Sequence, residues 1–233
     1  MEEIKVSILI PYLNQERNLK SSIIKAQMFL NSYEIKGEII IIDNMVNSNK
    51  IENKTNFKVI HIDKEGLGSA LEIGTNEANG KYIVIGDAND TYDFLNLKKF
   101  VEKIDEGYDL VIGNRYLGGI EGYSMSLISR YISNPLMSFL GKRLFSSNLK
   151  DFGCVLRIYN KERIKKLNLE CENDEYLYEM LISSHINNYK VTEISTTFSR
   201  NNKKRKPCLN GFQVISFMFK MYFNKDKYKI SNK

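Results

Sequence analysis

Short runs of aliphatic, mostly β-branched residues recur along the first half of the chain, and polar or turn-forming residues close each run. Such unbroken runs are typical of strands that are buried on both faces of a sheet. Segments with helical periodicity separate them. The alternation therefore predicts an α/β fold with a mostly parallel central sheet flanked by helices. The expected strands are 6–10, 38–42, 58–62, 81–85 and 109–112, and the expected helices are 14–33, 66–79 and 95–105.

The second half of the chain is less regular. Helices are expected over 126–145, with an interruption near Pro135, and over 175–186 and 210–223, with short strands at 155–159 and 190–197. The 233 residues suit one large domain, and no apolar run reaches the roughly 18–20 residues that cross a bilayer. The acidic start lacks the order of a signal peptide, and the three cysteines are too scattered for a disulfide framework or a zinc site. A cytoplasmic protein is therefore expected.

The net charge of +6 is concentrated at the end of the chain. Ten of the 34 Lys and Arg residues lie in 200–233, whereas one of the 28 acidic residues does. A basic end suits nucleic acid, an anionic membrane surface or a phosphorylated substrate. Nucleic acid is the least favoured partner, because the chain has no basic motif with interleaved stacking aromatics and its body is mildly acidic.

The loop after the expected strand 81–85 reads GDAND at 86–90. Closely spaced carboxylate and amide oxygens at a strand end suit Mg²⁺ or Mn²⁺, which bind through one or two carboxylates and the phosphates of a substrate. The alternative is a solvated turn, and the motif alone favours that alternative because Asp and Asn are ordinary turn residues. Since ligands of parallel sheets bind beyond the carboxyl ends of the strands, this loop should share a crevice with the loops at 11–14 and 43–44.

Other polar positions carry weaker signals. Asp43 can contact a nucleobase or ribose at the crevice, or simply end its strand. Gly66 and Gly68 can let the backbone approach a phosphate, or merely precede a helix. Five arginines suit phosphate binding, although most surface arginines are only solvated charges. They are Arg115, Arg130, Arg157, Arg200 and Arg205.

Three further features have plain structural alternatives. Glu175 and Glu179 share a helical face and can position a substrate or form surface pairs. His61 lies at a strand end and is expected to be structural or exposed. The Phe- and Met-rich stretch 212–223 is most simply a core-facing helix, but its aromatic excess and the lysines that follow also suit a membrane surface.

Seven stretches of the sequence occur in an order and at a spacing that identify a protein family far more specifically than any single stretch does. They are VSILIPYLNQERNL, GEIIIIDN, EGLGSALEIGTNEANGKYIVIGDANDTYDF, GYDLVIGNRYLGGI, SRYISNPLMSFLGKRLF, DFGCVLR and EYLYEM. On these stretches the chain resembles the family 2 glycosyltransferases of the GT-A fold. Within that family it resembles the branch related to dolichyl-phosphate mannose and glucose synthases.

The resemblance implies one GT-A domain over 1–223, followed by a basic tail at 224–233. A Rossmann-like nucleotide-sugar-binding half would occupy about 1–115, and an acceptor half 116–223. The family transfers a sugar from a nucleotide-diphosphate sugar, and this branch usually transfers it to a polyprenyl phosphate. The expected function is therefore an inverting hexosyltransferase with a UDP- or GDP-linked donor, acting in glycan or cell-envelope biosynthesis.

The resemblance also implies roles for individual donor-site positions. The donor site implied in this way consists of the first nucleotide-binding loop, a base-contacting acid, the metal motif and a mobile basic loop near the diphosphate. The implied donor-binding residues are Pro11, Tyr12, Asn14, Glu16, Asp43, Gly68, Asp87, Ala88, Asn89 and Arg205. Asp87, with Asn89 or Asp90, would hold Mg²⁺ or Mn²⁺, which would neutralise the diphosphate leaving group.

For the acceptor, the resemblance implies basic residues that hold its phosphate and a recurrent helix carboxylate. The implied acceptor residues are Arg115, Arg130, Ser133, Asn134 and Glu179. Because a phosphate is already anionic at neutral pH, positioning and charge neutralisation can supply most of the catalysis. A hydroxyl acceptor would need a base, for which Asp151 is the candidate. The implied catalytic residues are Asp87, Asp151, Arg115, Arg130 and Arg157, the last from the segment that closes over the sugar.

The sequence departs from the family pattern within the predicted crevice. Asn89 stands where the metal motif prefers Asp, Met45 and Val46 replace Gly-Ser, and Val155 replaces a Gly. These departures support an alternative, a catalytically degenerate nucleotide-sugar-binding or partner protein on the same fold. The segment 212–229 is expected to contact a membrane peripherally, whereas an undocked apolar helix there would favour a homodimer.

Overall fold

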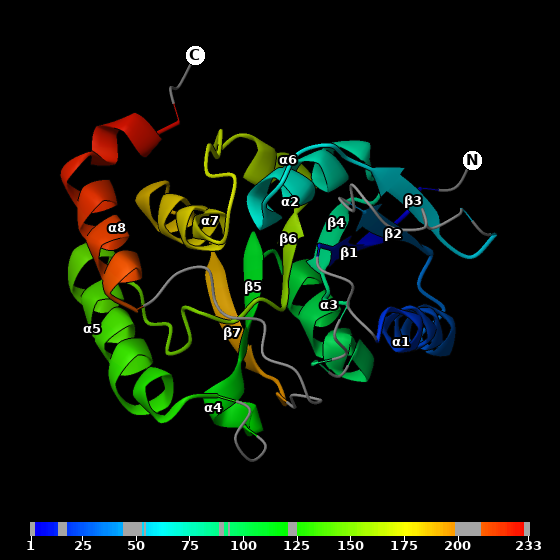
Figure 1. Cartoon of the computed structure of the whole chain (residues 1–233), viewed down its shortest axis with the longest axis horizontal. Helices are drawn as coiled ribbons and strands as arrows, with labels where there is room; N and C mark the ends of the chain where they lie inside the picture. The colour runs from blue at the N-terminus through cyan, green and yellow to red at the C-terminus, as the bar shows by residue number, and fades with distance from the viewer. Residues whose placement is uncertain are drawn as a thin grey trace.

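The computed structural model describes residues 3–13, 18–43, 53, 55–88, 91–92, 94–120, 125–198 and 211–230. Within these ranges, strands from both predicted halves form one seven-stranded sheet in the order β3-β2-β1-β4-β6-β5-β7 (Figure 1). The strands are β1 (Val6–Tyr12), β2 (Gly37–Asp43), β3 (Lys58–His61), β4 (Tyr82–Ile85), β5 (Leu110–Asn114), β6 (Arg157–Asn160) and β7 (Val191–Ser195). Neighbouring strands are parallel except around β6, which runs antiparallel to β4 and β5. The predicted mostly parallel α/β sheet is confirmed.

The strand register brings several loops to one edge of the sheet. Tyr12 at the end of β1 pairs with Asp43 at the end of β2. Arg157 at the start of β6 pairs with Ile85 at the end of β4 and with Ile112 near the end of β5. Because β6 is reversed, the loop that enters it arrives at the edge where the parallel strands end. The carboxyl edge therefore carries loops from both predicted halves of the chain.

Helices cover both faces of the sheet (Figure 1). One face carries α1 (Leu19–Ser32) and α3 (Leu97–Asp105), and the other carries α2 (Leu67–Glu77), α5 (Asn134–Phe145), α7 (Glu175–Ile186) and α8 (Gly211–Phe223). Successive strand residues alternate between the two cores, as Ile41 and Ile42 of β2 do. The unbroken apolar runs of the sequence are explained by this burial on both faces.

The helix expected over 126–145 is split. Ser129–Ser133 forms a π-helical turn, η2, and α5 follows it with Pro135 in its first turn, where a missing N–H is tolerated. Two short helices were not predicted from the sequence, α4 (Arg115–Gly118) and α6 (Lys161–Lys165). Each follows an asparagine, Asn114 or Asn160, whose side chain accepts backbone N–H groups of the first turn. Helices this short leave no periodic signal.

The C-terminal segment packs against the body of the chain. α8 buries Val214, Met218 and Met221 in the core that it shares with α5 and α7. A short 3₁₀ turn, η3 (Lys225–Tyr228), follows, and Asn187 at the end of α7 holds it by hydrogen bonds to the Tyr228 carbonyl (2.7 Å) and the Ile230 N–H (2.8 Å). The described part of the predicted basic tail is thus docked on α7. Among the described helices, none is long and apolar enough to cross a bilayer.

Candidate active site

Five of the predicted donor-site residues lie at the carboxyl edge of the sheet. Pro11 and Tyr12 end β1, Asp43 ends β2, and Asp87 and Ala88 follow β4. Ligands of open α/β sheets bind beyond this edge, so the structure brings these residues to the expected place. The predicted site residues Asn14, Glu16, Asn89, Asp90 and Arg205, as well as Arg200, Met45 and Val46, lie outside the described residues.

Asp43 is buried at this edge and has a histidine beside it. Its Oδ2 lies 3.2 Å from Nδ1 of His61, which is its register partner on β3. His61 is 41% exposed at its side chain, whereas Asp43 is 1% exposed. His61 was expected to be structural or exposed, and its place beside Asp43 was missed. The sequence feature that could have predicted this contact is that both residues end strands expected to be parallel neighbours.

Asp87 is half-buried, and Thr91 holds its carboxylate. The Thr91 hydroxyl donates to Oδ2, and the Thr91 backbone N–H donates to Oδ1 over 3.2 Å. A carboxylate fixed at a strand end has the donor chemistry that Mg²⁺ and Mn²⁺ prefer. Within the described ranges no three His, Cys, Asp or Glu side chains cluster as a metal site. Asp87 therefore fits a divalent cation as one ligand of a set whose other predicted members, Asn89 and Asp90, are not described.

Gly66 and Gly68 are explained by close packing at the start of α2. A Cβ added to Gly68 would lie 2.1 Å from the Cys171 carbonyl oxygen, and one added to Gly66 would lie 2.2 Å from that of Glu172. Gly66 also has a φ of +102°, which side-chain-bearing residues rarely adopt. The glycines thus let the loop before α7 cross over α2. The donor-binding role of Gly68 stays a prediction.

Arg115 and Asp151 form a buried bidentate ion pair. Arg115 Nε donates to Oδ2 over 2.7 Å, Nη2 donates to Oδ1 over 2.6 Å, and the Arg115 backbone N–H donates to Oδ2 over 3.0 Å. Burial by itself lowers the pKa of Arg115, but the hydrogen bonds and charge of Asp151 raise that pKa well above its ordinary value. The sequence suggested separate roles for these two residues, and the structure joins them.

Polar groups converge on Gly153, in the loop that enters β6. A Cβ added there would lie 3.1 Å from Arg115 Nη2, 3.4 Å from Asn134 Oδ1 and 3.4 Å from the Tyr178 hydroxyl. Asn134 Nδ2 in turn donates to the Tyr116 hydroxyl over 2.6 Å. Burial raises the pKa of Tyr178 to about 12, so its hydroxyl is neutral at physiological pH. Tyr116 and Tyr178 were not predicted as site residues, although both lie in stretches that carry the family resemblance.

Arg130 and Ser133 lie on η2. Arg130 is half-buried, with its guanidinium 5.5 Å from the centroid of the Tyr131 ring, and its carbonyl accepts the Tyr116 hydroxyl over 3.3 Å. Ser133 lies against the start of α8, because a Cβ added to Gly211 would be 2.6 Å from its Oγ. The structure therefore places η2 next to both the Asn134–Tyr116 contact and α8.

Arg157 and Glu179 have internal partners. Arg157 is fully buried and donates to the carbonyls of Leu177 (2.8 Å) and Cys154 (2.6 Å), and burial lowers its pKa. Glu179 is also buried, and its Oε2 accepts two backbone N–H groups of residues 170–171 at 3.0 and 2.9 Å. Both side chains join α7 to a neighbouring loop. Their catalytic and acceptor-binding roles stay predictions.

Val155 and Cys154 contribute to packing. The Val155 side chain packs against both hydrophobic cores. Burial raises the pKa of Cys154 to about 12, so the thiol stays protonated, and burial likewise raises the pKa of the half-buried Cys171 to about 12. These two cysteines therefore serve as small apolar packing residues. Cys208 lies outside the described residues.

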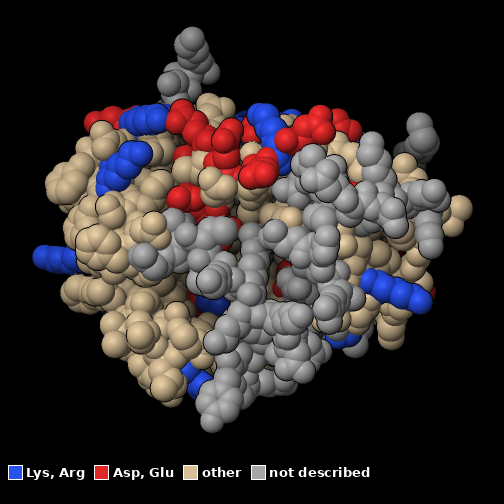
Figure 2. All heavy atoms as spheres, viewed as in Figure 1, with Lys and Arg blue, Asp and Glu red and all other residues tan. Residues whose placement is uncertain are grey.

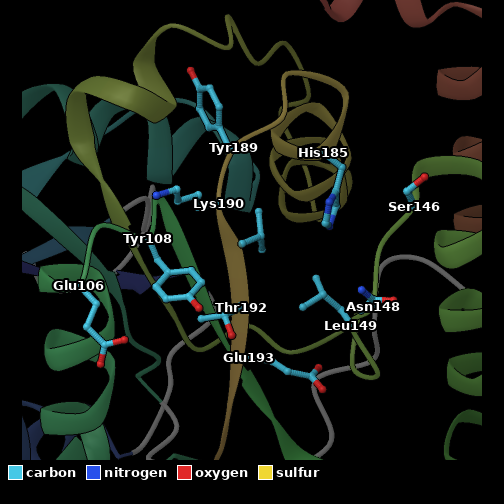
Figure 3. A pocket seen from close by; sticks show the side chains of 11 residues that line it. Glu106, Tyr108, Ser146, Asn148, Leu149, His185, Tyr189, Lys190, Thr192 and Glu193 are labelled. Carbon is cyan, nitrogen blue, oxygen red and sulfur yellow. The ribbon is translucent and has the colours of Figure 1, made fainter.

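A groove of about 680 Å³ lies along β7 (Figure 3). Residues of β7, of the end of α7 and of the loop after α5 line it, and none of the predicted site residues is among them. One of its lining residues, Glu193, accepts hydrogen bonds from Asn114 and from the backbone of Lys150. These partners immediately precede Arg115 and Asp151, so the groove is linked to the ion pair.

Comparison with known proteins relates these features to one family. The sequence model described as glycosyl transferase family 2 matches residues 7–167. The chain is 25% identical over 195 residues to the low-salt glycan biosynthesis hexosyltransferase Agl6 of Haloferax volcanii, a match that covers 83% of this chain and 47% of that protein. It is 28% identical over 227 residues to the dolichol-phosphate mannosyltransferase of Pyrococcus furiosus, covering 94% and 63%. The chain thus spans about half to two thirds of the length of these curated relatives.

Solved structures show the same fold. The crystal structure of glucosyl-3-phosphoglycerate synthase from Mycobacterium tuberculosis, in complex with Mn²⁺, UDP and phosphoglyceric acid, matches with a TM-score of 0.68 and 16% identity. The match covers 94% of this chain and 78% of that one. At this identity the likeness concerns the fold, and it confirms the predicted GT-A architecture.

Proposed function

The chain belongs to glycosyl transferase family 2, and from this premise we propose that it is an inverting hexosyltransferase acting on a nucleotide-diphosphate sugar and a polyprenyl phosphate. The observation that carries the proposal is the convergence of Tyr12, Asp43 and Asp87 at one sheet edge, which the Asp151 loop also enters. The names of two relatives, a glycan biosynthesis hexosyltransferase and a dolichol-phosphate mannosyltransferase, support a role in glycan biosynthesis.

The donor is proposed to bind across the ends of β1, β2 and β4. Asp43 would accept hydrogen bonds from the base or ribose, with His61 beside it. Asp87, oriented by Thr91, would hold Mg²⁺ or Mn²⁺ together with Asn89 or Asp90. A bound divalent cation supplies neutralisation of the charge on the departing diphosphate. The Mn²⁺ and UDP in the solved synthase support this choice of cofactor and ligand class.

The ion pair favours a phosphate acceptor over a hydroxyl acceptor. Asp151 is fully buried, and both of its carboxylate oxygens already accept hydrogen bonds from Arg115. It could deprotonate a hydroxyl only if this pair opened. An oxygen of an acceptor phosphate is already ionised, so it can bond to the anomeric carbon while the bond to the nucleotide diphosphate breaks on the opposite face. The pair uses two of the five guanidinium N–H donors of Arg115, which leaves others to orient that phosphate.

A band of exposed apolar side chains beside this site supports a lipid-linked acceptor. Its members, between 39% and 80% exposed, are Leu127, Ile128, Tyr131, Ile132, Leu136, Phe139, Phe212, Phe219 and Phe223. This apolar band extends over η2, α5 and α8, which contact one another, and α5 and α8 lie side by side in Figure 1. In the same view, the surface over α5 and α8 is mostly uncharged (Figure 2). Arg130 lies within the band, so a basic side chain accompanies the apolar surface. We infer that the band contacts a membrane peripherally, over a wider surface than the predicted segment 212–229.

The experiment that tests this proposal is a titration of the purified chain with UDP- and GDP-sugars, with and without Mn²⁺. The two quantities measured are the heat of binding and the release of nucleotide diphosphate. The proposal expects metal-dependent binding, and release that is stimulated by polyprenyl phosphate. Binding without release, even with polyprenyl phosphate present, would favour the degenerate binding protein instead. The absence of any binding would overturn the proposed donor site.

A further inference from the structure

Glu193 joins two backbone segments that are distant in sequence. It lies in β7 and is half-buried, and its side chain extends into the groove near Leu149 (Figure 3). Its Oε1 accepts a hydrogen bond from Asn114 Nδ2 over 2.7 Å. Its Oε2 accepts the backbone N–H of Lys150 over 2.8 Å. Hydrogen bonds to an ionised carboxylate are among the stronger ones in proteins.

Each partner of Glu193 controls one half of the buried ion pair. Asn114 ends β5, and its Oδ1 accepts the backbone N–H groups of Tyr116 (2.9 Å) and Leu117 (3.0 Å), which fixes the turn that begins with Arg115. Lys150 immediately precedes Asp151. One carboxylate therefore bridges the residue before Arg115 and the residue before its counter-ion Asp151.

We propose that Glu193 is a positioning residue for transfer to the acceptor, because it holds Asn114 and Lys150 so that Arg115 and Asp151 meet in bidentate geometry. This inference rests on the proposed function. The proposed donor contacts are carried by the ends of β1, β2 and β4, whereas Glu193 lies on β7, the edge strand that pairs with β5. Loss of its hydrogen bonds should therefore slow transfer while donor binding persists.

A reciprocal exchange of side chains tests the proposal. In Asn114→Asp, two carboxylates face each other across the 2.7 Å contact, and in Glu193→Gln the introduced amide can accept only one of the two N–H groups. In the double variant the introduced amide can donate to the introduced carboxylate and still accept from Lys150. The carboxylate at 114 can still accept from Tyr116 and Leu117. All hydrogen bonds of the network are then restored with one of them reversed.

The expected result is a fall in kcat for transfer of about tenfold in each single variant, with recovery in the double variant. The dissociation constant of the donor should change by less than about twofold in all three. Glu106→Gln is the matched control, because this carboxylate lines the same groove but pairs with Lys103 (2.6 Å). It should leave kcat unchanged. Additive losses in the double variant, or equal losses of donor binding and turnover, would overturn the positioning role.

Hydrogen exchange separates this proposal from the proposed function. Amides of residues 115–118 and 150–153 should exchange faster in each single variant and return to the wild-type rate in the double variant. If the wild-type chain shows no transfer but the exchange rates follow this pattern, the network is upheld and the proposed function fails. If the wild-type chain transfers sugar and neither kcat nor exchange responds to the variants, the positioning role fails alone.

Discussion

Asp151 accepts three hydrogen bonds from Arg115, two from its guanidinium and one from its backbone N–H. The two side chains are 0% and 9% exposed. A buried pair of this kind is costly to break on one side, because the remaining charge loses its partner without regaining water. Two residues with predicted catalytic roles therefore also join the end of β5 to the loop that enters β6.

Asp151→Asn should destabilise the chain strongly. The substitution leaves the buried Arg115 charge without a counter-ion, so the free energy of unfolding should fall by about 3–5 kcal/mol. Urea denaturation measures this. Lys5→Ala is the control, because the Lys5–Asp105 pair is 40% and 42% exposed and should contribute less than about 1 kcal/mol. A loss as small as that of the control would mean that the buried pair does not stabilise the fold.

Thr91 should matter through its hydroxyl. Asp87→Ala should abolish metal-dependent release of nucleotide diphosphate, because it removes the described carboxylate of the predicted metal site. Thr91→Val keeps the shape of the side chain but removes the donor to Asp87, so activity at limiting Mn²⁺ should fall about tenfold. Thr91→Ser keeps the hydroxyl and should stay near wild type. Undiminished activity of Asp87→Ala would refute the metal assignment.

His185 should make the stability of the fold depend on pH. Burial lowers its pKa to about 4, from an ordinary value of 6.5, and its buried Nε2 has no hydrogen-bond partner among the described residues. Between pH 6.5 and 4 the unfolded chain therefore binds a proton that the folded chain does not. Stability should fall by up to about 3 kcal/mol as the pH drops through this range, and level off below it.

The variant His185→Gln isolates this contribution. Its free energy of unfolding, measured in urea at several pH values, should vary less between pH 6.5 and 4 than that of the wild type. If His185→Gln leaves the slope unchanged, other groups cause the acid sensitivity.

The apolar band should bind lipid. Replacing one of its large side chains, as in Ile132→Ser or Phe139→Ser, should weaken binding to anionic liposomes in flotation by about tenfold or more, because burial of such a side chain contributes about 1.5–3 kcal/mol. Ile24→Ser on α1 is the matched control, since Ile24 is 47% exposed but lies outside the band. Absence of binding by the wild type would contradict the membrane role, and a dimer that Phe139→Ser dissociates would assign the band to a second copy.

The elements of this fold were largely predictable, whereas their contacts were not. Each strand of the first half shows in the sequence as an apolar run, because burial on both faces requires one. The reversal of β6 left no such trace, since strand direction does not affect which residues are buried. The joining of Arg115 to Asp151, 36 positions away, depends on that reversal and was equally invisible.

The candidate site was predictable where residues end strands. Asp43 and Asp87 could be placed at the carboxyl edge from the sequence, because each follows an apolar run that predicts a parallel strand. Glu193 was not predicted as a site residue. A charged residue inside a short expected strand is normally assigned to the solvent-exposed face, and the sequence gives no sign of its distant hydrogen-bond partners. Arg157 was predicted as a catalytic residue, and the internal hydrogen bonds of its guanidinium to the carbonyls of Leu177 and Cys154 were not foreseen. Its position within an aliphatic strand was the signal for burial.

The crowding around Gly153 limits how this chain can diversify. A methyl group there would lie 3.1 Å from Arg115 Nη2, which is tighter than most Cβ contacts, and 3.4 Å from Asn134 Oδ1 and the Tyr178 hydroxyl. A larger side chain at this position is therefore expected to displace the Arg115 guanidinium and so to disturb the ion pair. We expect natural or laboratory variation in acceptor choice to enter through η2 and α8, where side chains are exposed and can be exchanged one at a time.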